Sequence, residues 1–151
     1  GKQEFVKIPI FGLIYKRVVI MVDRSSPKSR KRVFKMAKEK LKNGTSMAIF
    51  PEGLGPTENV VLAPFKNGAF SLAIEFEIPI VPQVYYDCKR FFSWDFFKGR
   101  PGIFRVYQHE FIETKGLQID DIERLKDKTF EIIHTSLLQD KKYMKDTNST
   151  K

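Results

Sequence analysis

The sequence has few of the residues that build disulfide frameworks, metal centres and membrane-spanning helices. Its 151 residues contain one cysteine, Cys88, and two histidines, which excludes an internal disulfide and a cysteine-based zinc site. A single cysteine also suits a reducing compartment. The longest largely apolar stretch, residues 5–22, is interrupted by Lys7, Lys16 and Arg17, so it does not qualify as a transmembrane helix. We expect neither a metal nor a bound cofactor.

Positive charge is abundant by contrast, with a net charge of +9. Such a protein favours anionic partners, which are nucleic acid, acidic lipid head groups or phosphorylated small molecules. A nucleic-acid partner is the weakest of these readings. The sequence carries no recognisable RNA- or DNA-binding motif, and its aromatic residues gather in one segment instead of alternating with basic ones.

The hydrophobic pattern predicts alternating strands and helices. Short apolar runs predict strands at residues 18–22, 46–50, 78–85 and 104–112. Helical spacing predicts helices at residues 27–42, 66–76 and 120–139, and a short helix or loop at 7–15. We therefore expect an α/β fold with a mostly parallel central sheet covered by helices. It should form one domain over residues 1–140, followed by a polar, disordered tail over 141–151.

Two of the predicted helices carry clear local signals. Ser26 is expected to cap the helix over 27–42, with Pro27 in its first turn, and Asn43-Gly44 is expected to end it. The helix over 120–139 has an apolar face that consists of Ile119, Ile122, Leu125, Ile133 and Leu137.

Polar residues follow the first two predicted strands. Arg24 comes after the first strand, and Glu52 and Gly53 come after the second. In open α/β sheets, ligands bind outside the carboxyl ends of parallel strands, so these groups are expected to share one rim. Lys66 stands at the start of the predicted helix over residues 66–76, whose free N–H groups attract anions. The sequence thus predicts a phosphate site, although each residue taken alone also reads as an ordinary surface or turn residue.

Four short segments stand in an order shared with a known family. They are residues 8–12 (Ile-Pro-Ile-Phe-Gly) with 19–24 (Val-Ile-Met-Val-Asp-Arg), 49–53 (Ile-Phe-Pro-Glu-Gly), 64–70 (Pro-Phe-Lys-Asn-Gly-Ala-Phe) and 78–82 (Ile-Pro-Ile-Val-Pro). Over about residues 3 to 139, the chain therefore resembles the glycerophospholipid acyltransferases, in particular those that acylate lysophosphatidic acid.

The resemblance implies transfer of an acyl chain from acyl-CoA or acyl carrier protein to the free hydroxyl of lysophosphatidic acid, which yields phosphatidic acid. It also implies that Arg24 binds the acceptor's phosphate, that Glu52 and Gly53 shape the same site, and that Lys66 adds charge. The family usually continues Thr-Arg-Ser after the glycine, whereas this chain has Leu-Gly-Pro at residues 54–56. Another lysolipid or glycerol-3-phosphate therefore stays open as the acceptor.

The family's catalytic element is a histidine followed, after four residues, by an aspartate, and this chain lacks it. Thr114 stands five positions after His109 and Gln139 stands five positions after His134, so both histidines are expected to be structural. No base is placed near Cys88 to make it a substitute nucleophile. We expect the element to lie upstream of a truncated start, with natural loss and a non-catalytic lipid- or phosphate-binding module as the alternative.

An aromatic segment near the middle of the chain suggests contact with lipid. Residues 91–97 hold five aromatic side chains, and basic residues follow them. We expect Phe92, Trp94, Phe96 and Phe97 to enter an anionic membrane surface, although a core patch under a loop is the alternative. The basic segment 16–42 has eleven Lys or Arg and two acidic residues, which suits the same surface or a solvated face. The expected location is the cytoplasmic face of a membrane, either peripheral or anchored through a missing N-terminal segment.

Overall fold

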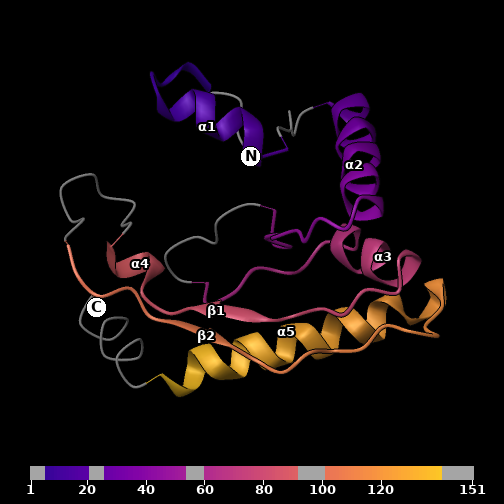
Figure 1. Cartoon of the computed structure of the whole chain (residues 1–151). Helices are drawn as coiled ribbons and strands as arrows, with labels where there is room; N and C mark the ends of the chain where they lie inside the picture. Colours follow the sequence, from indigo (N-terminus) through magenta and orange to yellow (C-terminus); the bar gives the residue numbers. More distant parts are fainter. Residues whose placement is uncertain (1–5, 21–25, 54–59, 92–100, 141–151) are drawn as a thin grey trace. The chain divides into compact units, whose positions relative to one another are not determined.

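The computed structural model describes residues 6–20, 26–53, 60–91 and 101–140 (Figure 1). Contacts group the chain into two compact units, which we call the N-terminal unit, Gly1–Ile49, and the C-terminal unit, Phe50–Lys151. The helices and strands in chain order are α1 (Phe11–Val18), α2 (Pro27–Lys42), α3 (Gly68–Glu75), β1 (Gln83–Tyr85), α4 (Cys88–Phe91), β2 (Val106–Gln108), the 3-10 helix η2 (Ile119–Asp121) and α5 (Ile122–Gln139). The single domain over residues 1–140 stays a prediction, and the predicted tail lies outside the described residues.

Helix α2 begins and ends where the sequence predicted. The Ser26 hydroxyl accepts a hydrogen bond from the Ser29 N–H at 3.3 Å, and Pro27 occupies the first turn, where no N–H partner is needed. Asn43 follows the last helical residue, and Gly44 then adopts a φ of 73°, which a residue without a Cβ reaches easily. The capping residues therefore define this helix.

Helix α1 replaces the start of the predicted strand at residues 18–22. Val18 is its last residue, and the Val19 N–H donates to the Tyr15 carbonyl at 3.0 Å, which continues the helical pattern. A run of β-branched residues favours a strand only where another strand pairs with it. Here the backbone of Val18 and Val19 forms local helical hydrogen bonds instead. Residues 21 and 22 lie outside the described residues. No helix in the described part of the chain is both long and apolar enough to cross a bilayer.

The sheet of the C-terminal unit is smaller than predicted. Within the described residues it has two strands, β1 and β2, which pair antiparallel with Val84 opposite Tyr107. A single bridge between Ile80 and Ile112 extends the pairing. Pro79 and Pro82 lack the N–H that a longer strand would need, so β1 covers only the end of the predicted range 78–85. Likewise, β2 covers only the middle of the range 104–112.

The expected parallel arrangement is not confirmed. Residues 46–50 form no strand, because a strand exists only where a neighbouring backbone accepts and donates its hydrogen bonds. The Phe50 side chain is 73% exposed, and its ring lies 6.3 Å from that of Tyr85. The α/β class itself is retained, because helix α5 packs on the small sheet.

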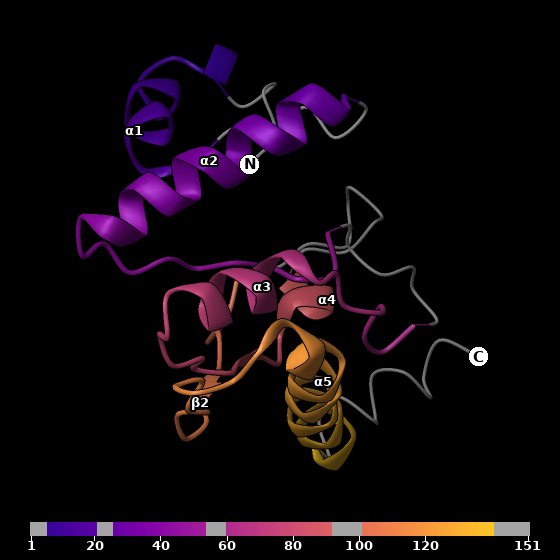
Figure 2. The ribbon, with the colours of Figure 1, turned by 90° about the vertical axis from the view of Figure 1, so that its right-hand side faces the viewer.

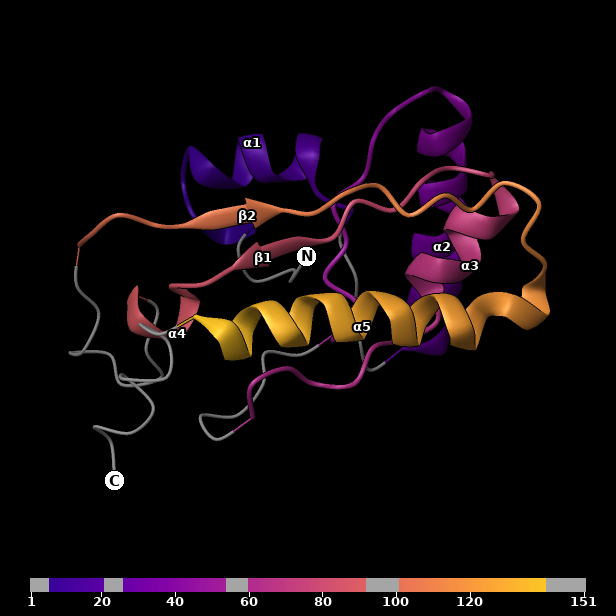
Figure 3. The same cartoon turned by 90° about the horizontal axis from the view of Figure 1, so that it is seen from below.

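The core of the C-terminal unit lies between α3, α5 and the strand segments. It consists of Phe65, Phe70, Ile74, Ile112 and Leu125. Helix α5 runs along β1 (Figure 3) and also contacts α3 (Figure 2). Leu125 and Leu137 are buried and Ile122 and Ile133 pack on this core, as the predicted apolar face requires. Ile119 is 71% exposed and does not belong to that face, because it lies in η2.

Candidate functional site

The turn at Pro51–Gly53 contacts Lys66, two residues before the start of α3. The Lys66 N–H donates to the Pro51 carbonyl at 2.8 Å, and the Gly53 N–H donates to the Phe50 carbonyl at 3.2 Å. Gly53 has a φ of 75°, in the left-handed region that favours glycine. A Cβ built at Gly53 would lie 3.7 Å from Cγ of Lys66, so this turn packs against the aliphatic stem of the lysine. The structure thus brings the predicted residues Gly53 and Lys66 together.

The Glu52 side chain forms a hydrogen bond across the segment that separates this turn from α3. Its Oε2 accepts a hydrogen bond from the Ala63 N–H at 2.7 Å, across eleven residues of chain. A carboxylate that accepts from a backbone N–H forms one of the stronger hydrogen bonds in proteins. Glu52 therefore holds both ends of the segment in place, beside the lysine that comes three residues after Ala63.

The start of α3 leaves its backbone N–H groups uncapped by a side chain. Asn67 occupies the N-cap position, but it forms no side-chain cap. Instead, its side chain donates to Glu123 Oε1 at 2.8 Å and accepts from Lys126 Nζ at 3.2 Å, both on α5. The first turn of α3 has no acidic residue, and Lys66 is exposed beside it. A lysine next to a positive helix end is an arrangement that attracts an anion such as phosphate.

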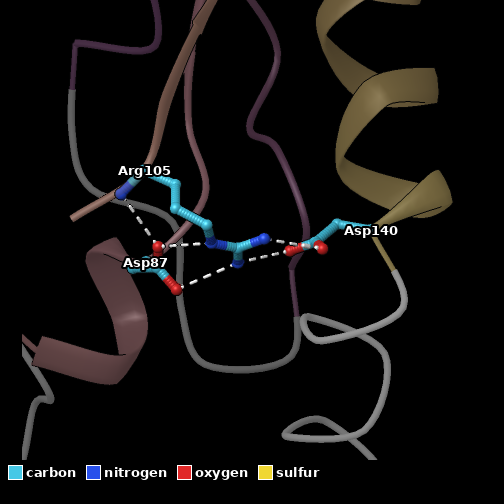
Figure 4. A network of polar contacts seen from close by, with 3 residues as sticks. All are labelled: Asp87, Arg105 and Asp140. Carbon is cyan, nitrogen blue, oxygen red and sulfur yellow. Dashed lines mark hydrogen bonds and ion pairs between the residues drawn. The ribbon is translucent and has the colours of Figure 1, made fainter. Parts of the chain in front are cut away.

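A polar network that the sequence did not predict joins three segments of the C-terminal unit (Figure 4). The buried carboxylate of Asp87, at the start of α4, accepts from the Arg105 backbone N–H at 3.0 Å and from Arg105 Nε at 2.9 Å. Asp140, at the end of α5, accepts from the other edge of the same guanidinium at 3.0 and 2.8 Å. Hydrogen bonds to Asp140 and Asp87 raise the pKa of Arg105 and keep it charged. The network links the end of β1, the start of β2 and the end of α5.

Cys88 follows Asp87 directly and lies within electrostatic reach of Glu52. Desolvation, supported by the negative charges of Asp87 and Glu52, raises the pKa of the Cys88 thiol above its ordinary value. The thiolate is the reactive form of cysteine, so these surroundings make Cys88 a poor nucleophile at neutral pH.

Both histidines contact residues of the fold. His109 Nε2 lies 2.8 Å from the Ser136 hydroxyl on α5, and the His109 ring meets Tyr107 edge-on at 4.8 Å. The His134 ring stacks on Phe130 at 5.4 Å. Within the described residues, no group of histidine, cysteine, aspartate and glutamate side chains is arranged to hold a metal ion.

Several predicted site residues lie outside the described residues. Arg24 belongs to the segment 21–25, so its expected proximity to Glu52 stays a prediction. The predicted membrane residues Phe92, Trp94, Phe96 and Phe97 belong to the segment 92–100, and their role likewise stays a prediction.

The fold and the site define an α/β protein in which a turn with a glycine packs against a lysine two residues before a helix. Residues 1–86, more than half of the chain, match the family model described as Acyltransferase. The chain belongs to this acyltransferase family. The turn at Pro51–Gly53, Lys66 and the beginning of α3 all lie within the matched residues.

Two curated relatives extend the comparison. The chain is 31% identical to human 1-acyl-sn-glycerol-3-phosphate acyltransferase beta, over 99% of this chain and 54% of that protein. It is 32% identical to the 1-acyl-sn-glycerol-3-phosphate acyltransferase of Helicobacter pylori, over 62% of this chain and 40% of that protein. The chain thus spans about half the length of these relatives.

A solved structure has the same fold. It is the 1-acyl-sn-glycerophosphate acyltransferase PlsC of Thermotoga maritima, which superposes with a TM-score of 0.72 at 24% identity. The match covers 92% of this chain and 54% of that chain. The α/β, acyltransferase-like fold class predicted from the sequence is therefore confirmed.

Proposed function

We propose that this domain serves the transfer of an acyl chain from a thioester donor to the free hydroxyl of lysophosphatidic acid, giving phosphatidic acid in phospholipid synthesis. The chain belongs to the acyltransferase family, and the relatives described above are named for acyl transfer to 1-acyl-sn-glycerol-3-phosphate. The donor is acyl-CoA or acyl carrier protein. A thioester donor needs no further cofactor for this reaction.

One observation carries the proposal: Lys66 and the turn at Gly53 meet beside the uncapped start of α3. In this role Lys66 places its ammonium against the phosphate of the acceptor, and Gly53 lets the ligand approach the backbone. Glu52 acts through the segment that it closes on Ala63. Arg24 supplies a second cation for the same phosphate, as the family resemblance implies.

The test is the acceptor KM of an active protein that joins this domain to a His-x4-Asp element. Losing a charge-assisted contact with phosphate should raise the KM for lysophosphatidic acid about tenfold in Lys66→Ala. Arg24→Ala should act in the same direction, and an acceptor without phosphate should respond less. Lys115→Ala, which removes another exposed lysine, is the matched control. An equal rise in KM for lysophosphatidic acid and for the acceptor without phosphate would show that Lys66 does not bind the phosphate.

Membrane contact is part of the proposal. A lysolipid acceptor lies in a bilayer, and the net charge of +9 suits an anionic phospholipid surface on the cytoplasmic face. The aromatic residues Phe92, Trp94, Phe96 and Phe97 are proposed to enter this surface. Phe91, which precedes them at the end of α4, has its ring 6.2 Å from Phe104.

The second candidate is a non-catalytic lipid- or phosphate-binding module. The observation that favours it is the absence of a His-x4-Asp element from these 151 residues. The joined protein separates the two candidates, because acyl transfer supports the enzyme, whereas lysophosphatidic acid binding without transfer supports the module. Comparing lysophosphatidic acid, other lysolipids and glycerol-3-phosphate in the same assay tests the effect of Leu-Gly-Pro at residues 54–56.

A further inference from the structure

Helix α1 exposes most of its apolar side chains. Phe11, Leu13, Ile14 and Val18 have exposed fractions between 48% and 69%. Ile8 and Ile10, in the turn that leads into the helix, are exposed as well. Contiguous apolar groups on a protein surface mark a site of interaction with a partner or a membrane.

Three of the exposed apolar residues of α1 form one continuous face, and Leu13 lies on the other side of the helix. Phe11, Ile14 and Val18 are three, four and seven residues apart, so they share one side of the helix. Gly12 lies off this face and is buried, and the Val6 carbonyl oxygen stands so close to it that a Cβ would clash there. The chain before α1 thus folds against Gly12, away from the apolar face.

Cations accompany this face. Lys16 and Arg17 stand in the last turn of α1, and residues 6–20 include no acidic residue. In the same unit, the sequence of α2 has eight basic residues and one acidic residue. A partner must therefore offer hydrocarbon and negative charge close together. The interface of a bilayer with anionic lipids provides both within the depth of one helix.

We propose that α1 lies in the interface of an anionic phospholipid bilayer. Phe11, Ile14 and Val18 enter the acyl-chain boundary, while the long side chains of Lys16 and Arg17 extend to the head groups. The proposal concerns a contact distinct from the segment 92–97. It requires membrane binding but not acyl transfer, so it is tested independently of the reaction.

The first experiment measures sedimentation of the 151-residue chain with vesicles of phosphatidylcholine and phosphatidylglycerol. Ile14→Asn combined with Val18→Asn should weaken partitioning by about tenfold or more, because two inserted side chains are lost. Leu13→Asn changes an equally exposed residue on the other side of the same helix, so its effect should be much smaller. Equal losses in both variants would contradict the assigned face.

The second experiment reports insertion directly. Phe11→Trp in a Trp94→Phe background places the single tryptophan on α1, and its emission should shift to shorter wavelength with anionic vesicles. The reporter Phe111→Trp, at an exposed position of the C-terminal unit, should not shift. An unchanged emission from position 11 would overturn the proposal. Analytical ultracentrifugation showing a dimer that the double variant abolishes, with vesicle binding unchanged, would assign the face to a second copy instead.

Discussion

The two units of the chain differ in where their apolar side chains lie. The C-terminal unit encloses Phe70, Val84 and Ile74, each at most 6% exposed. Among the described residues of the N-terminal unit, the buried hydrophobic side chain is that of Ala37, whereas the apolar face of α1 is exposed. Burial of a large apolar side chain contributes roughly 1.5–3 kcal/mol, so the core of the C-terminal unit stabilises that unit, whereas the exposed face of α1 adds little to the stability of the N-terminal unit.

The largest expected effect comes from shortening one apolar side chain in each unit to alanine. Phe70→Ala should lower the free energy of unfolding by about 3–5 kcal/mol, because it leaves a cavity where the ring packed against Phe65. Leu13→Ala should change it by less than about 0.5 kcal/mol, since Leu13 is exposed. Urea unfolding followed by circular dichroism measures both. Similar losses would show that α1 is buried in solution and would break the comparison.

A second prediction sharpens the picture of the C-terminal unit. Asp87→Asn removes the buried charge that holds Arg105 and should cost about 2 kcal/mol. This loss of stability is smaller than for a fully buried ion pair, because the Arg105 side chain is 36% exposed and retains its ion pair with Asp140 in the variant. Asp127→Asn, an exposed change on α5, is the control and should stay within about 0.5 kcal/mol. Equal unfolding midpoints for the two variants would contradict a stabilising network.

The smallest effect concerns the start of α5. A hydrogen bond from the Gln118 N–H, and then one from Arg124, lower the pKa of Asp121. The stabilisation is thus present above the ordinary aspartate pKa and is lost as the pH falls through the lowered value. NMR titration of the carboxyl should give a midpoint below that of an unfolded peptide, and Arg124→Gln should move it partly back. Identical midpoints in the folded and unfolded chains would contradict the stabilising hydrogen bonds to the Asp121 carboxylate.

Local signals predicted the parts of the structure that form by local interactions. Ser26 and Gly44 define α2, and the spacing of Leu125 and Leu137 predicts the buried face of α5. The positive φ of Gly53 was not predicted, although it depends on a single residue. The strands were predicted too long, since pairing depends on partners that an apolar run does not reveal, and Pro79 and Pro82 interrupt it.

The amino-acid sequence by itself determined the α/β class, the family resemblance and the nature of the candidate site residues. Only the tertiary structure decided that Lys66 packs on Gly53, that Glu52 closes on Ala63 and that Asp87, Arg105 and Asp140 form one network. The physical reason is separation along the chain. A cap or a turn is encoded within a few residues, whereas a contact across eleven to 35 residues exists only once the core has brought the segments together.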